Sequence, residues 1–420
     1  MADLRLRRDI AWNLVPVVLL AVVGLGLNFL IAGWWGTGAL GIFHLVTISY
    51  FVLAVVGAFG IQFSVLRAIA AKPDDRDHVA ATVVGALVPN VVLAAIATAG
   101  FLLARGSLAK LLDHPEVADG IVWASGGLFC FSINKVLFGI VNGMRRMRAF
   151  AVYTSLRYVL IAIAILVARG TDMATSHLAG IWTFVEGALL IVLAIEVVAT
   201  VSFRRGAGWM RWAREHLDYG VRGTPAMLAA EINIKLDVWM LGASGITKEA
   251  VGMYTLAATI NEGATQLAVV VQNNVNPMIA SSLVAGQRGE VEALITRTRT
   301  WFVPAFIAAC AVGALAFPIL IPRVLGDPTL VDAAIPFAIL MLGLAVASPY
   351  LPFTQILLMA DRPGWHTVFM VLVVATNFTA NIVLIPYLGL AGAAAATTIA
   401  VITSAVLIRG LARGKVAIRC

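Results

Sequence analysis

Long apolar segments separated by short polar linkers follow one another along the whole chain. Each segment has the roughly 20 mostly apolar residues that a helix needs to cross the hydrocarbon core of a bilayer. Because backbone polar groups must be satisfied internally in lipid, the pattern predicts an all-α polytopic membrane protein with about twelve transmembrane helices. The predicted spans are residues 10–32, 40–66, 79–104, 118–142, 149–168, 176–202, 219–242, 250–281, 300–322, 330–358, 363–385 and 389–410.

The amino-acid composition is that of a protein surrounded by lipid. Hydrophobic residues make up 61% of the 420 residues and charged residues 12%, whereas soluble domains carry about 25% charged residues. The net charge of +8 lies in short clusters between the apolar segments, which indicates membrane topology and no nucleic-acid partner. The three cysteines have no spacing typical of a metal site or a disulfide framework, and we expect no cofactor.

The distribution of Lys and Arg predicts how the helices are oriented. With the N-terminus placed inside, 21 of the 30 Lys and Arg residues lie in inside linkers and 5 in outside linkers. Positive charge accumulates on the cytoplasmic side of membrane proteins. Both termini are therefore expected in the cytoplasm, which agrees with an even number of spans.

The longest inside linker divides the chain into two halves of six spans each. Its sequence is FRRGAGWMRWAREHLD, and the tryptophans among its arginines predict a short amphipathic helix at the membrane surface. The predicted units are an N-terminal six-helix lobe at 1–202, a cytoplasmic amphipathic linker at 203–218 and a C-terminal six-helix lobe at 219–420.

An internal repeat supports two related halves. The segment Ala39–Leu45, ALGIFHL, matches Ala250–Leu256, AVGMYTL, and both follow the outer end of a predicted span. Two like-oriented halves of six spans are typical of transporters. The halves would be related by an axis along the membrane normal.

The chain shows no pattern of an enzyme. Its six histidines are scattered near predicted helix ends, so neither a metal site nor a catalytic triad is indicated. A phosphate-binding P-loop is missing from the sequence, so nucleotide hydrolysis by this chain is not expected. The candidate chemistry lies instead in ionisable residues within the apolar spans, where each charge costs a few kcal/mol or more.

The seventh predicted span carries Glu231, Lys235 and Asp237. Glu231 and Lys235 are four residues apart and share a helix face, whereas Asp237 points to a different side of the helix. Two interpretations remain open. The first two residues form an intrahelical ion pair that only stabilises the bundle, or they line a substrate cavity.

The eighth predicted span has a polar stripe that includes Glu262, Gln266, Asn273 and Asn276. Such a stripe cannot face lipid. It either makes hydrogen bonds between helices or lines a cavity. Glu262 lies near the middle of the span and is the best single acidic candidate.

The N-terminal half also carries charges within its spans, at Lys135, Arg157, Glu186 and Glu196. Lys135 and Arg157 lie near predicted cytoplasmic ends and could extend to the membrane surface along their aliphatic stems. The alternative is a cationic cavity that attracts a diphosphate. Glu186 lies deeper in its span than Glu196, and proximity to the surface does not explain it.

Four stretches of the chain resemble the Wzx-type polysaccharide and O-antigen flippases of the multidrug/oligosaccharidyl-lipid/polysaccharide superfamily. They are LNFLIAGWWGTGALGIFHLV, NIKLDVWMLGASGITKEAVGMYTLA, VQNNVNPMIASS and NFTANIVLIPYLGLAGAAAATTIA. The second stretch has the family's Asp in the seventh span, here Asp237, followed by a Gly-hydrophobic-Tyr start of the eighth span. Each motif is loose, but their order and spacing together are specific.

The resemblance implies a V-shaped fold of two six-helix lobes that alternates between inside-open and outside-open states. It implies a flippase, not an enzyme, in the bacterial plasma (inner) membrane. The substrate would be an undecaprenyl-diphosphate-linked oligosaccharide, moved from the cytoplasmic to the outer leaflet for the biosynthesis of O-antigen, capsule or exopolysaccharide. The substrate-cavity candidates are Lys135, Arg157, Lys235, Asp237 and Glu231, and the candidates for H⁺ or Na⁺ coupling are Glu186, Glu231 and Glu262.

The expected partners are the lipid-linked oligosaccharide and membrane lipids. Monomeric action is expected of two fused lobes, and the resemblance suggests association with a polysaccharide polymerase or glycosyltransferases. Three alternatives remain. A multidrug or cation antiporter of the superfamily would carry an acid in the first span, where this chain has Asn28. A lipid II flippase would have fourteen spans, and a membrane glycosyltransferase or polymerase would need a larger outer loop than residues 105–116.

Overall fold

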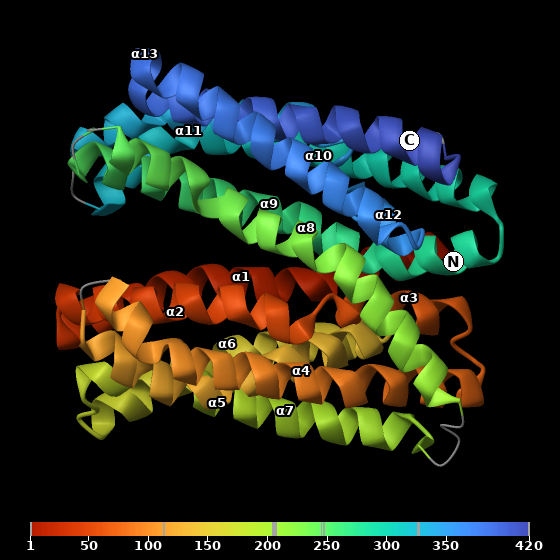
Figure 1. Ribbon diagram of the computed structural model, residues 1–420. Helices are drawn as coiled ribbons and strands as arrows, with labels where there is room; N and C mark the ends of the chain where they lie inside the picture. The colour runs from red at the N-terminus through yellow and green to blue at the C-terminus, as the bar shows by residue number, and fades with distance from the viewer. Residues whose placement is uncertain are drawn as a thin grey trace. The chain divides into compact units, whose positions relative to one another are not determined.

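The computed structural model describes residues 2–111, 114–203, 208–244, 246, 248–325 and 328–418. Those residues are almost entirely helical and contain no strand. The chain divides into two compact units, Met1–Thr224 and Pro225–Cys420. Helix α8 (Trp209–Ala243) begins in the first unit and continues without interruption into the second (Figure 1).

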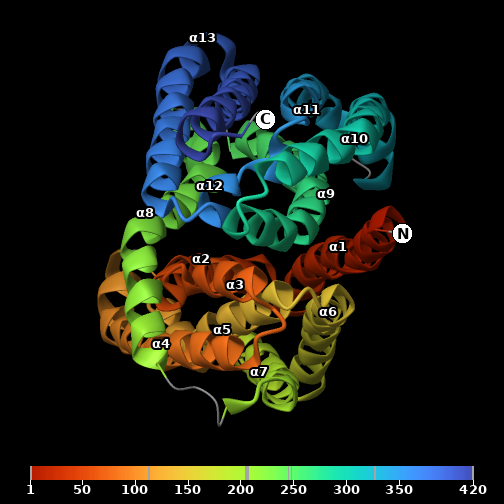
Figure 2. The ribbon, with the colours of Figure 1, turned by 90° about the vertical axis from the view of Figure 1, so that its right-hand side faces the viewer.

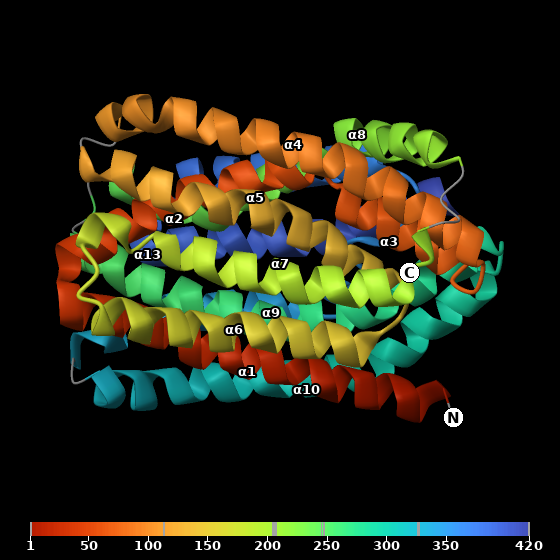
Figure 3. The same cartoon turned by 90° about the horizontal axis from the view of Figure 1, so that it is seen from below.

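Unit 1 is built around α5, which contacts α2, α3, α4 and α7. In the view of Figure 3, α5, α6 and α7 run alongside one another. Aromatic residues fill the space between the helices, where Tyr50 stacks on Trp182 with ring centroids 5.9 Å apart. The Tyr50 hydroxyl donates a hydrogen bond to the Gly127 carbonyl. The elements of unit 1 before α8 are α1 (Ala2–Trp35), α2 (Thr37–Ala58), α3 (Ile61–Ala71), α4 (Arg76–Leu111), α5 (Glu116–Gly143), α6 (Met147–Gly170), η1 (Thr175–His177) and α7 (Gly180–Thr200).

Unit 2 holds the rest of α8 and the helices that follow it (Figure 2). Among its described residues, α11 packs extensively on α13 and on α10. The elements after α8 are α9 (Lys248–Val284), α10 (Arg288–Leu325), η3 (Pro328–Ala333), α11 (Ala334–Ala347), η4 (Leu351–Phe353), α12 (Ile356–Met359), α13 (Pro363–Leu411) and the π-helical turn η5 (Ala412–Val416).

The helices account for all twelve predicted spans. Among the described residues, nine helical segments are long and apolar enough to cross a membrane. One of them, α13, contains two helices that meet at Gly389, whose backbone is not helical. The other two predicted spans lie in α8 and α9, which have the length but carry several charged or polar side chains. The two spans that depart from the apolar pattern are those with the candidate residues of the C-terminal half.

The second predicted span, 40–66, is not one helix as expected. It breaks between α2 and α3, where Phe59 and Gly60 both have left-handed backbones with φ of 50° and 68°. The amide of Asn90 on α4 compensates part of the break, because its Nδ2 donates to the Gly57 carbonyl over 3.0 Å. A break at membrane depth requires such a protein donor or acceptor, since lipid offers none.

The tenth predicted span, 330–358, is also discontinuous. It consists of η3, α11, η4 and α12, with turns after Ala347. Two polar side chains of α9 hold this segment. Gln272 donates to Thr354 over 2.7 Å, and Asn276, a member of the predicted polar stripe, donates to Gln355 over 2.8 Å. This part of the stripe makes interhelical hydrogen bonds, which was one of the two interpretations of its polarity.

The first part of α8 packs on unit 1. Gly220 lies so close to Phe59 that a Cβ there would overlap the phenylalanine ring and carbonyl. His216 is completely buried between α3 and α4, where Ser64 Oγ lies 2.7 Å from its Nδ1 and the Thr82 carbonyl lies 3.2 Å from its Nε2. The carbonyl can only accept, so Nε2 carries the proton and Nδ1 accepts from Ser64.

Within the predicted cytoplasmic linker, 203–218, the described helical residues are the start of a longer helix. Residues 204–207 lie outside the described part of the chain, and residues from Trp209 onward form the start of α8. Trp212 packs edge-on against His78 at a centroid distance of 5.1 Å. The tryptophan therefore contacts unit 1, whereas Met210 and Arg211 on other sides of the helix are exposed.

Candidate functional site

Three helices of unit 1 bring a cluster of charged and polar side chains together. Glu186 on α7 is completely buried. Its carboxylate lies 2.9 Å from Arg157 Nε on α6 and accepts a hydrogen bond from Arg157 Nη2 over 3.1 Å. Asn134 on α5 donates to the same carboxylate over 2.9 Å. A buried carboxylate requires a counterion and hydrogen-bond donors to replace water, and here it has both.

Aromatic rings fix the position of the Arg157 guanidinium. The guanidinium carbon lies 5.0 Å from the centre of the Phe131 ring and 5.3 Å from that of Phe138. Lys135 Nζ lies 5.1 Å from the same Phe131 ring. The Phe131 ring therefore has two cationic side chains beside it, those of Arg157 and Lys135.

The cluster exposes its cationic side. The side chain of Arg157 is 19% exposed, whereas that of Glu186 is completely covered. Glu186 engages Nε and Nη2 of the guanidinium, which leaves Nη1 as a further donor. A guanidinium donates through a planar fork that matches the oxygens of a carboxylate or phosphate. The chemistry that this cluster offers is therefore the binding of an anion.

Unit 2 has a polar cluster of opposite charge around Asp237, which is 6% exposed. One carboxylate oxygen accepts from Asn377 over 3.0 Å and from Asn381 over 2.9 Å. The other accepts from Tyr254 over 3.0 Å and from Thr397. These donors come from α9 and from both halves of α13, so the acid ties three spans to α8.

The Asp237 cluster offers a different chemistry from the cluster in unit 1. Its carboxylate is surrounded by amide and hydroxyl groups, and Oδ1 of Asn381 is buried without a hydrogen-bond partner. The amide and hydroxyl groups donate to both carboxylate oxygens, so the lone pairs of the acid are used for contacts within unit 2. An anionic substrate group would be repelled from it.

The chain matches a known protein family over most of its length. The model of the family described as polysaccharide biosynthesis protein matches residues 6–284. The chain belongs to this family. It is the family of Wzx-type flippases, as the four resembling stretches indicated. A search of curated proteins finds no sequence that matches the chain.

Solved structures of transporters share the fold of this polysaccharide biosynthesis family member. The Vibrio cholerae MATE transporter VcmN in the bent form has a TM-score of 0.82 and 15% identity, covering 98% of this chain and 96% of that one. A MOP superfamily transporter from Pyrococcus furiosus has a TM-score of 0.81 and 15% identity, covering 98% and 95%. The prediction of an all-helical, two-lobed polytopic membrane fold is confirmed.

The structure places the predicted site residues of this family member in different surroundings. Arg157 and Glu186 form one buried pair with Lys135 beside it, whereas Asp237 belongs to the second cluster. Glu231 and Glu262 are partly exposed on α8 and α9. The side chain of Lys235 lies outside the described residues, and so does its predicted pairing with Glu231.

Sequence reasoning missed several neutral residues of both clusters. Asn134 holds Glu186, and Asn377 and Asn381 hold Asp237. The two asparagines on α13 are four residues apart in NFTAN, within an otherwise apolar span. That spacing places two amides on one helix face, and it was a signal for a buried polar partner that could have been used.

Proposed function

We propose that this family member is a flippase for an undecaprenyl-diphosphate-linked oligosaccharide, which it moves from the cytoplasmic to the outer leaflet of the bacterial plasma (inner) membrane. The observation that carries the proposal is the cationic cluster of Arg157 and Lys135 beside Phe131. A diphosphate has the charge and the oxygen geometry that a guanidinium and an ammonium bind. Membership of the polysaccharide biosynthesis family supports a glycan-bearing substrate.

An apolar groove in unit 2 supports a lipid carrier. It lies along α13 with a volume of about 540 Å³ and is lined by residues of both α13 helices, among them Leu372, Val383 and Ile399. Leu372 and Val383 are about half exposed. A groove of this character suits a prenyl chain, because burial of its carbons needs no polar partner.

The acids proposed for coupling to H⁺ or Na⁺ differ in what they touch. Glu186 is held by Arg157, so we assign it the role of positioning that guanidinium. Glu231 and Glu262 are partly exposed and remain our candidates for ion coupling. For Asp237 we propose a structural role in place of a contact with the diphosphate, because its carboxylate already accepts hydrogen bonds from side chains of α9 and α13.

A reconstituted flipping assay tests the proposal. Purified protein in liposomes would be given a fluorescent undecaprenyl-diphosphate oligosaccharide, and its accessibility in the outer leaflet would be followed with time. Lys135→Gln and Arg157→Gln are expected to slow flipping about tenfold or more through loss of a charged contact. Arg169→Gln is the matched control, because Arg169 is exposed and pairs with Asp172 near a helix end.

Two outcomes would contradict the proposal. Efflux of a cationic drug without movement of the lipid would favour the antiporter alternative. Unchanged flipping in both variants would remove the cationic cluster from the substrate path. Imposed proton and sodium gradients in the same liposomes, with Glu262→Gln and Glu231→Gln, would test the coupling assignment.

A further inference from the structure

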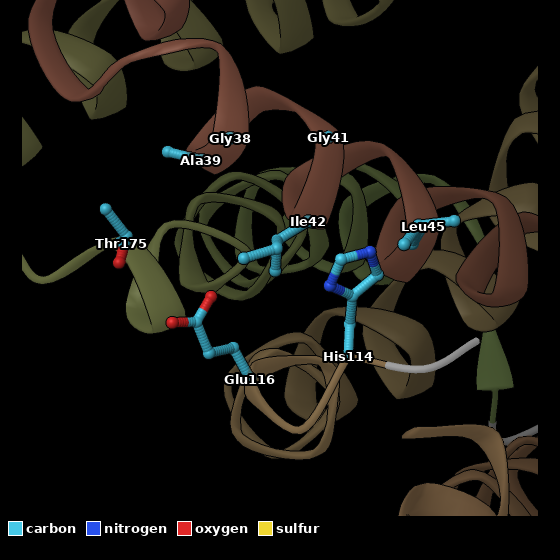
Figure 4. Close-up of a pocket in the computed structure, with 8 residues that line it drawn as sticks. All are labelled: Gly38, Ala39, Gly41, Ile42, Leu45, His114, Glu116 and Thr175. Atoms are coloured by element: carbon cyan, nitrogen blue, oxygen red, sulfur yellow. The ribbon is translucent and has the colours of Figure 1, made fainter. Parts of the chain in front are cut away.

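Unit 1 has a cavity that is lined by none of the residues of the charged cluster. Its volume is about 680 Å³. Residues from the first turns of α2, from the start of α5 and from η1 line it (Figure 4). This is the end of the unit that the proposed topology places outside the cell. A cavity of this size falls in the range of small-molecule sites, roughly 300–1,000 Å³.

One wall of the cavity is apolar. It is formed by Gly38, Gly41 and Ile42 of α2. The two glycines are three residues apart and share a helix face. A Cβ added at either would meet no atom within 4 Å, so the glycine backbone itself borders open space.

The opposite wall is polar. His114 and Glu116 extend from the start of α5 toward α2 (Figure 4), and Thr175 contributes from η1. Imidazole, carboxylate and hydroxyl groups together supply both donors and acceptors. The carboxylate of Glu116 disfavours a phosphate here, so this cavity suits a neutral ligand with several hydroxyl groups.

We propose that this cavity binds a pyranose ring, as a glycan site on the outer face. A pyranose has an apolar C–H face, which matches the glycine and isoleucine wall, and a rim of hydroxyls, which matches His114, Glu116 and Thr175. The site's place in the cycle rests on the proposed flippase function, in which the glycan emerges on this side. Its binding of a sugar does not require the lipid or the diphosphate.

The test is binding of free sugars to the full-length protein in lipid nanodiscs. Methyl glycosides of glucose, galactose, rhamnose and N-acetylglucosamine would be titrated by saturation-transfer difference NMR, which detects weak binding. At least one glycoside is expected to bind saturably. Gly41→Leu fills the open space, and it is expected to abolish this binding. Glu116→Gln is expected to weaken the binding severalfold, because a charge-assisted hydrogen bond becomes a neutral one.

Gly106→Leu is the matched control, because Gly106 is an exposed glycine of α4 with equal space above it and does not line the cavity. It should bind the glycoside as the native chain does. Binding by none of the glycosides, or binding that survives Gly41→Leu, would overturn the site. Flipping of the lipid-linked substrate is measured separately, so a failed sugar site and a failed flippase assignment give different results.

Discussion

At the scale of single residues, the structure shows which charged side chains are fully buried against their neighbours and which remain partly exposed. Glu186 is completely covered, and its contacts go to Arg157 and Asn134. The sequence identified both charged members, because an ionisable residue in an apolar span is rare. It could not identify their pairing, since residues 157 and 186 are on different helices and periodicity says nothing of which helices pack together.

The Arg157–Glu186 pair leads to a testable expectation about stability. Glu186→Gln and Arg157→Gln should each destabilise the protein, on the order of 3 kcal/mol, because each leaves a buried charge without its counterion. The double variant should lose less than the sum of the two single losses. Thermal unfolding of the purified variants in one detergent measures this coupling.

A matched exposed pair provides the control for this cycle. Arg169 and Asp172 form an ion pair with 52% and 89% of their side chains exposed. Replacing either by its amide or glutamine counterpart should change stability by less than about 1 kcal/mol. Additive losses at Arg157 and Glu186 would show that the two residues do not depend on each other.

At the scale of elements, the apolar pattern located the spans but not their breaks. The turn at Gly389 was predicted between two spans, because a glycine followed a proline there. The break at Phe59 was not, because a phenylalanine rarely adopts a left-handed backbone and gives no warning in the sequence. The contacts that accompany the break, from Asn90 and from Gly220 of α8, come from residues distant in sequence.

The close approach of α8 to this break predicts the effect of one methyl group. Gly220→Ala would place a Cβ against the Phe59 ring and carbonyl, so we expect a loss of about 1–3 kcal/mol from overpacking. Gly187→Ala, on α7, meets nothing within 4 Å and should be neutral or slightly stabilising. A lower Tm for the first variant alone would support the contact, and equal Tm values would contradict it.

The buried His216 on α8 predicts a dependence of stability on pH. Burial lowers the pKa of His216 to about 4, whereas an unfolded histidine titrates near 6.5. Between these values the unfolded chain binds a proton that the folded chain does not, so stability falls as the pH drops from about 6.5 toward 4. The contribution at pH 5 is on the order of 2 kcal/mol.

Replacement of the histidine tests this origin. His216→Gln should reduce the change in Tm between pH 7 and pH 5, whereas His177→Gln, at the partly exposed η1, should leave it unchanged. The measurement is thermal unfolding in detergent at the two pH values. An undiminished pH effect in His216→Gln would assign it to other groups.

At the scale of the whole molecule, the fold and family were predictable because lipid restricts the choices. A chain of this composition must form helices that satisfy their own backbones, and the loops between them carry the topology. The four resembling stretches then indicated the family that the family model identifies. The substrate was not predictable to the same depth, since glycan and ion specificity depend on side-chain contacts between distant spans.

The charge distribution along the whole chain predicts the orientation of the helices across the membrane. Lys and Arg are concentrated in the linkers assigned to the inside, so we expect a C-terminal fusion to be cytoplasmic. A pair of reporters, one active only in the cytoplasm and one only outside it, measures this. An extracytoplasmic signal would contradict the orientation or the even number of spans.

The course of α8 has a consequence for how the chain could be divided. Residues from Trp209 to Thr224 belong to unit 1, where His216 packs between α3 and α4 and Gly220 lies against Phe59 at the end of α2. If the chain were cut ahead of Trp209, the second fragment would begin with a segment that packs on the first fragment. Two co-expressed fragments would thus be a natural split pair, whose reassembly could report on association inside a living membrane.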